Sequence, residues 1–230
     1  MDEPTWNRCD RLYEMFAFAQ DHLSERKRRL FAVACCRRGL HLMPKDSREA
    51  LEIAARYALG LESEEMLEKA DMLAFLTHLD ARDRAVVVEA EDVLPWSRPT
   101  ELITQAVSLA TSHGLYASFD AADHARRAIA EGAGWEGEQA EEIVQCRLLR
   151  EVVGPTLFRP TRIDPLWLVA NDRAAQRLAE EIEAGAMEYY PILGDALEDA
   201  GCNDPAILTH CRDYAGHVRG CWLVDLLLEK

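Results

Sequence analysis

The segment RKRRLFAVACCRR, residues 26–38, decides the fold that we expect for this chain. It carries six positive charges and no negative one, so the formal net charge of -15 divides into +6 here and -21 elsewhere. Its centre is apolar on every face of a helix, which predicts a buried central helix. Its basic ends are expected to emerge and meet acidic residues of the same fold, and Arg37 and Arg38 also suit the negative end of the helix dipole.

The basic segment has a second interpretation, as a contact for phosphate or nucleic acid. We favour ion pairing within the fold, because the acidic remainder of the surface would repel a phosphate backbone. Two adjacent cysteines, Cys35 and Cys36, lie at the end of the apolar stretch of the segment, directly before Arg37. Neighbouring side chains on a helix point about 100° apart, so a disulfide between them would be strained. We therefore expect both thiols to fill core volume.

Helical periodicity extends outward from this segment along most of the chain, and strand alternation is nearly absent. Ser24, Asp164 and Asp204 are expected to cap helices at their N-termini, and Gly201 is expected to adopt a left-handed conformation after a helix. The segment 81–93 is less clear, because three successive valines also tolerate a strand. Helices are expected over 10–23, 24–43, 47–61, 63–79, 100–114, 118–131, 137–153, 191–200 and 217–228.

The pattern predicts an all-α protein, either a multi-helix bundle or an irregular orthogonal array of helices. Residues 154–165 contain three prolines and lack helical periodicity, so they are expected to form an extended connection. This connection divides the chain into an N-terminal helical bundle, residues 1–153, and a C-terminal helical subdomain, residues 154–230. The subdomain either packs on the bundle or continues it as one domain.

Composition restricts the partners and the compartment that we expect. Forty-one acidic residues stand against 26 basic ones, which argues against nucleic acid and against an anionic membrane surface. Residues 1–6 lack the features of an export signal, and the longest apolar run, residues 30–36, is too short to cross a membrane. Seven cysteines are an odd number and show no regular framework, which favours reduced thiols in the cytoplasm.

The last thirty residues hold five of the fourteen cysteines and histidines of the chain, including His210. The spacing Cys202-x8-Cys211-x5-His217-x3-Cys221 allows a compact four-ligand zinc site, and four such ligands would make the zinc structural. The pattern lacks the close Cys-x2-Cys pair that most zinc sites show. The favoured interpretation is therefore that these thiols fill the core and the histidines form hydrogen bonds, with zinc as the alternative.

The expected terminal helix, residues 217–228, is almost uniformly apolar and must be buried. It contains Asp225, whose carboxylate would be costly to bury alone. We expect Arg37 or Arg38 to form a structural ion pair with Asp225, so that both ends of the chain close one core.

Several of these motifs together resemble a family of uncharacterised bacterial proteins. The resemblance rests on residues 26–38, on Phe158-Arg-Pro160 with Asp164-Pro-Leu-Trp167, and on the C-terminal stretches that begin at Ala196, His210 and His217. The motifs span most of the chain. The resemblance implies an intact member of that family and no particular activity, cofactor or catalytic residue.

Signatures of enzymes are missing from the sequence: it contains no glycine-rich phosphate loop, no nucleophile elbow and no His-Glu-x-x-His helix. Asp120, Asp123 and His124 share one helical face, which we interpret as a solvated surface. We expect a non-enzymatic protein-interaction or regulatory module without a cofactor, whose partner is another protein. An exposed apolar patch around Trp96 or Trp135 would favour this role. The alternatives are a small metal-binding protein with the C-terminal zinc, and an enzyme of unknown reaction.

Overall fold

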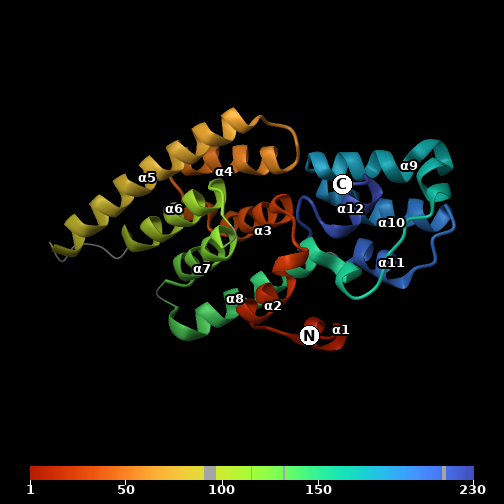
Figure 1. The fold of residues 1–230 in the computed structure, drawn as a ribbon, viewed down its shortest axis with the longest axis horizontal. Coiled ribbons are helices and arrows are strands. Elements are labelled where there is room, and N and C mark those ends of the chain that lie inside the picture. The colour runs from red at the N-terminus through yellow and green to blue at the C-terminus, as the bar shows by residue number, and fades with distance from the viewer. Residues whose placement is uncertain (91–96, 115, 132, 214–215) are drawn as a thin grey trace. The chain divides into compact units, whose positions relative to one another are not determined.

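The computed structural model describes residues 1–90, 97–114, 116–131, 133–213 and 216–230 (Figure 1). In these ranges the secondary structure is helical throughout, with no strand, which confirms the all-α prediction. Short 3₁₀ turns connect several of the helices. The α-helices are α1 (Glu3–Arg8), α2 (Leu12–Ala19), α3 (Glu25–Arg37), α4 (Lys45–Ala58), α5 (Glu64–Ala90), α6 (Ser97–Thr111), α7 (Ala117–Ala130), α8 (Gly134–Val153), α9 (Pro165–Ala184), α10 (Tyr190–Asp199), α11 (Pro205–Arg212) and α12 (Trp222–Leu227).

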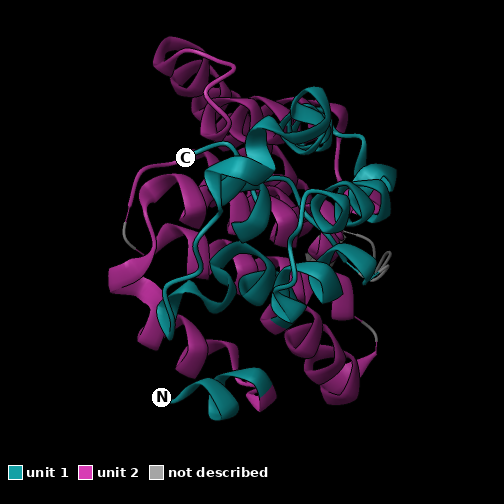
Figure 2. Cartoon of the chain, turned by 90° about the vertical axis from the view of Figure 1, so that its right-hand side faces the viewer, with its two compact units in different colours: residues 1–7, 147–230 teal, residues 8–146 magenta. Residues whose placement is uncertain are grey.

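The chain divides into two compact units, which Figure 2 colours separately. Unit 2 contains residues 8–146, and unit 1 contains residues 1–7 together with 147–230. The sequence suggested a division after residue 153, but the end of α8 and the first seven residues both belong to unit 1. Arg150 joins these parts, because its guanidinium donates from Nε and Nη2 to the main-chain oxygen of Trp6 at 3.1 and 2.9 Å.

Helix α3 packs against α4, α6 and α7 within unit 2. Residues 29–36 are all buried, as expected for the apolar centre of the basic segment. At the C-terminal end of the segment, Arg37 pairs with Glu52 at 2.7 Å, and Arg38 forms two bonds to Glu141 at 2.5 and 2.8 Å. For this end, the contacts confirm the predicted pairing with acidic residues of the same fold.

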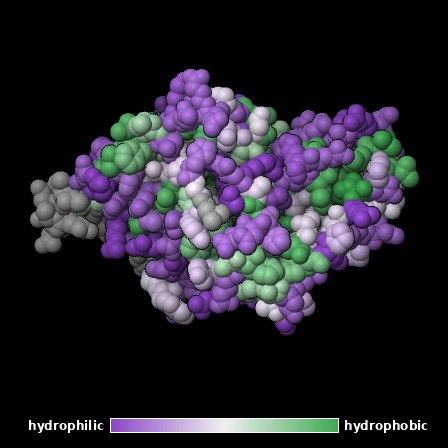
Figure 3. All heavy atoms as spheres, viewed as in Figure 1, coloured by the Kyte–Doolittle hydropathy of each residue, from purple (hydrophilic) through white to green (hydrophobic). Residues whose placement is uncertain are grey.

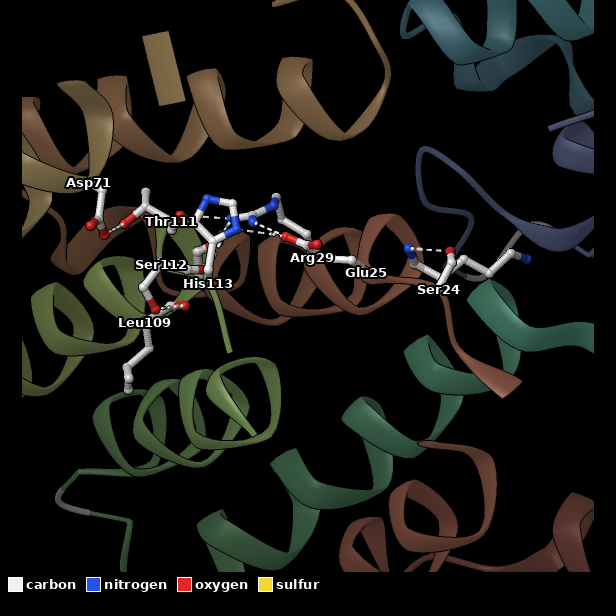
Figure 4. Close-up of polar contacts among 10 residues, drawn as sticks. Ser24, Glu25, Arg29, Asp71, Leu109, Thr111, Ser112 and His113 are labelled. Carbon is white, nitrogen blue, oxygen red and sulfur yellow. Dashed lines mark hydrogen bonds and ion pairs between the residues drawn. The ribbon is translucent and has the colours of Figure 1, made fainter. Parts of the chain in front are cut away.

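A buried arginine of α3 caps the C-terminus of α6 (Figure 4). The Nη1 atom of Arg29 donates to the main-chain oxygens of residues 110, 111 and 112 at 3.0, 2.7 and 3.2 Å. Its Nη2 atom donates to Glu25 at 3.0 Å, and the same carboxylate lies 2.8 Å from Nδ1 of His113. The last carbonyls of a helix lack partners within the helix and carry negative partial charge, so this guanidinium both satisfies and neutralises them.

The adjacent thiols of α3 are fully buried and reduced. Burial raises the pKa of the Cys36 thiol to about 12, so that it remains protonated at neutral pH. This confirms that Cys35 and Cys36 act as small core residues.

In unit 1, α10 packs against α9 and α11, and α12 packs against α9 and the 3₁₀ turn Gly154–Leu157. Asp164 and Asp204 cap α9 and α11 as predicted, and accept hydrogen bonds from the main chain two residues later at 2.9 and 2.8 Å. Gly201 has the expected left-handed conformation, with a φ of 95°. The core combines aliphatic residues with aromatic residues and thiols: Ala175, Ala179, Ile182, Tyr190, Leu193, Leu197, Cys202, Ile207, Cys211, Cys221, Trp222, Leu223, Val224 and Leu227.

Two predicted segments of unit 1 differ from the structure. The terminal helix is shorter than 217–228, because Gly220 has a φ of 74° and Cys221 is an extended N-cap whose Sγ accepts from the Val224 amide. Helix α12 therefore starts at Trp222, and His217 lies in an irregular segment. Residues 154–165 are only partly extended, because the first four form a 3₁₀ turn.

Helix α9 contains an interruption that the sequence did not predict. Asn171, Asp172 and Arg173 all have left-handed backbone angles, with φ values of 49°, 56° and 62°. Each left-handed residue other than glycine costs roughly 1 kcal/mol, although asparagine and aspartate tolerate the conformation better than most. Arg173, the last of the three left-handed residues, donates from Nε and Nη2 to the side chain of Gln176 at 2.9 and 2.6 Å.

The face drawn in Figure 3 is covered mainly by hydrophilic residues, with smaller apolar areas between them. Among the described residues, each helix lacks the combination of length and apolar composition that a bilayer crossing requires.

Candidate functional site

Three side chains of unit 1 that are suitable as metal ligands converge. These residues are Glu151, His210 and His217. Each offers one ligand atom, either a carboxylate oxygen or an imidazole nitrogen, and the three atoms lie within 4.8 Å of one another. The two carboxylate oxygens of Glu151 lie 3.6 Å from Nδ1 of His210 and 3.2 Å from Nδ1 of His217. All three side chains are largely buried, with 18, 9 and 8 % of their surface exposed.

Two helices that are far apart in sequence supply the first two members of the group. Glu151 lies in the last turn of α8, which ends where Gly154 adopts a φ of 68°. His210 lies in the last turn of α11, whose start is fixed by the Asp204 cap. Its ring lies 5.0 Å from the ring of Trp222, between centroids.

Aromatic stacking and an arginine hold the irregular segment that carries His217. The His217 ring stacks on Tyr190 of α10, with the centroids 3.6 Å apart and the planes 12° from parallel. Two residues later, Arg219 donates to the main-chain oxygen of Ala184 at the end of α9 at 3.2 Å. These contacts orient an imidazole that lies outside regular secondary structure.

A second set of contacts orients His210 from the other side. Its Nε2 atom lies 3.5 Å from Sγ of Cys221, which also accepts a hydrogen bond from the Tyr190 hydroxyl at 2.9 Å. Groups that contact the second nitrogen of a metal-binding imidazole typically fix its orientation and its proton. Nε2 of His217, by contrast, is buried and has no hydrogen-bond partner.

Burial governs the proton affinity of His210. It lowers the pKa of this imidazole to about 4, although the Glu151 carboxylate acts in the opposite direction and His217 adds slightly to the decrease. His210 is therefore neutral at pH 7, which is the form that binds metal ions. Burial likewise raises the pKa of the Tyr190 hydroxyl and raises that of the Cys221 thiol to about 12.

The low pKa of His210 predicts that the metal-free protein loses stability in mild acid. An unfolded histidine titrates near about 6.5, so between that pH and about 4 the unfolded chain binds more protons than the folded one. The contribution of His210 to the free energy of unfolding is fully present above about pH 6.5. It decreases by roughly 3 kcal/mol as the pH falls to about 4. Titration of the histidine resonances by NMR in the presence of a chelator checks this. A His210 midpoint at or above 6.5 would show that the Glu151 charge outweighs burial.

An open pocket of about 540 Å³ adjoins this group, and all of the residues that line it belong to unit 1. Glu151 and His210 form part of its wall. The remaining wall combines aromatic, charged and small residues: Glu3, Trp6, Asn7, Arg150, Gly154, Pro155, Phe158, Arg159, Pro205, Ala206, Thr209 and Trp222. Pockets of roughly 300–1,000 Å³ with a few convergent polar groups are typical of sites for small ligands.

The order Cys221, His210, Glu151 also resembles a nucleophile, a base and an orienting acid, but the environment of the thiol argues against nucleophilic catalysis. Cys221 is completely buried and does not line the pocket. Burial keeps its thiol protonated, whereas a nucleophilic cysteine needs an accessible thiolate. We therefore interpret Cys221 as a residue that orients His210.

Of the four zinc ligands predicted from sequence, only His217 belongs to the converging group. Cys202, Cys211 and Cys221 are members of the apolar core of unit 1 and are at most 2 % exposed. Burial raises the pKa of each of these thiols, to about 12 for Cys211 and Cys221. The four-ligand site remains a prediction, but the contacts favour thiols that fill core volume.

The predicted ion pair of Asp225 joins residues of different units. Asp225 is buried on α12 in unit 1, at 2 % exposure. Arg37 and Arg38 have carboxylate partners inside unit 2, namely Glu52 and Glu141. The pair with Asp225 remains a prediction.

The other candidates from sequence are surface features or lie outside the described residues. Nδ1 of His124 bonds to the main-chain oxygen of Asp120 at 2.8 Å, and Asp123 pairs with Arg126, as on a solvated helix face. Trp135 is 74 % exposed. Trp96 lies outside the described residues.

Sequence reasoning missed Glu151 and did not assign His210 to a site. Glu151 precedes His210 by 59 residues and sits among other acidic residues of α8, so no local spacing distinguishes it. The pair His210 and His217 was visible, but their spacing gave no indication of a carboxylate partner. Comparisons with protein families, with curated proteins and with solved structures found no match.

Proposed function

We propose that the protein binds one divalent transition-metal ion through Glu151, His210 and His217. The observation that carries this proposal is the convergence of two imidazole nitrogens on one carboxylate, with all ligand atoms within 4.8 Å of one another. Two histidines and one glutamate form a ligand set of zinc sites that keep a position open, and also a set that suits iron(II). The proposal keeps metal binding near the C-terminus and replaces the thiol ligands by a carboxylate and a second imidazole.

The distances support an ion of ordinary size. Two ligands about 2.0–2.1 Å from a tetrahedral ion lie about 3.3 Å apart. The two imidazole-to-carboxylate distances, 3.6 and 3.2 Å, lie on either side of that value, and each ends on a different oxygen of Glu151. With one ligand atom from each residue, the three atoms lie within 4.8 Å of one another, so the side chains would move closer together around an ion.

Hydrogen bonding is the competing interpretation, and it accounts for one of the two distances. Nδ1 of His217 lies within hydrogen-bond distance of Glu151, at 3.2 Å, whereas Nδ1 of His210, at 3.6 Å, does not. Nε2 of His217 is buried without a partner in both interpretations. Zinc uptake distinguishes the two interpretations, because a cluster held by hydrogen bonds alone takes up no metal.

Zinc titration of the full chain, stripped of metal with a chelator, tests the proposal. We expect uptake of about one equivalent by calorimetry and elemental analysis, and we expect Glu151→Gln and His217→Gln to weaken binding by at least about 100-fold. Cys211→Ala should leave zinc binding unchanged, although it would remove a ligand of the thiol site. His41→Gln, an exposed histidine of unit 2, is the matched control.

Two results would reject the proposal. One is the absence of zinc uptake by the folded wild-type chain. The other is zinc binding that survives Glu151→Gln but is lost in Cys211→Ala, which would favour the thiol ligands. Circular dichroism of each variant shows whether a loss of binding reflects loss of the fold.

The protein-interaction role expected from sequence remains a separate prediction. The exposed Trp135 is compatible with it, but single exposed apolar side chains are common on protein surfaces.

A further inference from the structure

We propose that the pocket beside Glu151 and His210 binds a small aromatic carboxylate, whose anionic group reaches the metal ion. This inference rests on the proposed metal site and names the class of ligand that the site would accept. It is carried by three features of the pocket: its position against two of the three metal ligands, its aromatic wall and its charge balance.

Position determines which part of the ligand meets the metal. Glu151 and His210 line the pocket, whereas His217 does not and stacks on Tyr190. An ion held by these three residues would border the pocket through the first two. A site with three protein ligands leaves at least one coordination position for water or for a ligand atom. A carboxylate oxygen from the pocket is a suitable donor for that position.

The aromatic wall determines the shape of the ligand. Trp6, Phe158 and Trp222 line the pocket, and the rings of Trp6 and Phe158 lie 6.0 Å apart at 57°. Trp6 and Trp222 are almost fully buried, so their rings are fixed by the core. Rigid aromatic rings favour a flat apolar ligand body, because edge-to-face and offset contacts add to the burial of its surface.

The charges on the wall make anion binding depend on the metal. Two carboxylates, Glu3 and Glu151, and two guanidinium groups, Arg150 and Arg159, line the pocket, so their formal charges cancel. Arg159 already pairs with Glu3 at 3.5 Å. A divalent ion would therefore give the pocket a net positive charge, and an anion would be attracted only when the metal is present.

Binding of 1-naphthoate by the full chain tests the inference, with calorimetry and tryptophan fluorescence as readouts. We expect zinc-loaded protein to bind 1-naphthoate at least about tenfold more tightly than zinc-free protein, and more tightly than the neutral analogue 1-naphthalenemethanol by a similar factor. Cyclohexanecarboxylate, which carries the charge without the aromatic ring, should also bind more weakly.

A variant that fills the pocket separates ligand binding from metal binding. Thr209 is exposed and lines the pocket, so Thr209→Trp should occupy the space without disturbing the core. We expect this variant to retain one equivalent of zinc and to lose binding of 1-naphthoate by at least about tenfold. Ile192→Trp, at an exposed position of α10 outside the pocket wall, should change neither.

The outcomes distinguish the inference from the proposed function. Zinc uptake without binding of 1-naphthoate would overturn the inference and leave the metal site intact. Three other results would also overturn the inference. The first is that 1-naphthalenemethanol binds as tightly as 1-naphthoate. The others are that zinc-free protein or Thr209→Trp binds 1-naphthoate as tightly as the zinc-loaded wild-type chain. Absence of zinc uptake would overturn both proposals.

Discussion

Replacing Arg29 by methionine is expected to destabilise unit 2 by about 3–5 kcal/mol, because it removes the donor to three main-chain oxygens. The Arg29 side chain is 3 % exposed and donates to three carbonyls at the C-terminus of α6 and to Glu25. Methionine has a similar length but no donors, so those carbonyls would be left buried without partners. Urea denaturation followed by circular dichroism measures the loss.

Arg37→Met on the same helix is the matched control. Arg37 is 30 % exposed and its partner Glu52 is 49 % exposed, so this ion pair is screened by solvent and worth at most about 1 kcal/mol. A loss for Arg29→Met no larger than that for Arg37→Met would show that the C-terminus of α6 does not depend on the buried guanidinium.

Replacing Gly154 by alanine is expected to destabilise unit 1 by about 2–4 kcal/mol and to weaken zinc binding. A Cβ atom at this position would lie 2.2 Å from Cγ of Trp222, and the backbone has a φ of 68°. The left-handed conformation costs about 1 kcal/mol for alanine, and overpacking a core adds about 1–3 kcal/mol. Because Trp222 lies against His210 and lines the pocket, its displacement should disturb the site as well.

Gly201→Ala isolates the backbone contribution to this effect. Gly201 also has a positive φ, of 95°, but a Cβ atom there would have no neighbour within 4 Å. We expect a loss of about 1 kcal/mol from chemical denaturation and unchanged zinc affinity. Equal stability of Gly154→Ala and Gly201→Ala would contradict this prediction. It would show that close packing of Trp222 on Gly154 does not stabilise this wall of the pocket.

The sequence predicted the helical fold where the determinants are local. The apolar centre of residues 26–38 required a buried helix, and Ser24, Asp164 and Asp204 marked helix starts because a capping side chain acts within three residues of its own position. The left-handed turn at residues 171–173 could not be read in this way. Asn171 and Asp172 tolerate that conformation, but both residue types also occur inside ordinary helices, where their propensity is lower by less than about 1 kcal/mol than that of alanine.

The site was less predictable, because its members come from separate elements. His217 and His210 lie near each other in sequence, whereas Glu151 reaches them only through the packing of unit 1. The cysteines dominated the sequence pattern, yet Cys202 and Cys211 pack in the core with aliphatic residues. Spacing along the chain showed which residues could be ligands, and the choice between thiol and carboxylate depended on tertiary contacts.

The absorption spectrum of the cobalt(II)-substituted protein tests the central claim most directly, because cobalt reports the identity of its ligands. The account predicts uptake of one equivalent, with visible bands of a nitrogen and oxygen ligand set and no sulfur-to-cobalt charge-transfer band in the near ultraviolet. These bands should disappear in Glu151→Gln. A strong charge-transfer band from thiolate ligands, or a protein that takes up no cobalt, would contradict the account.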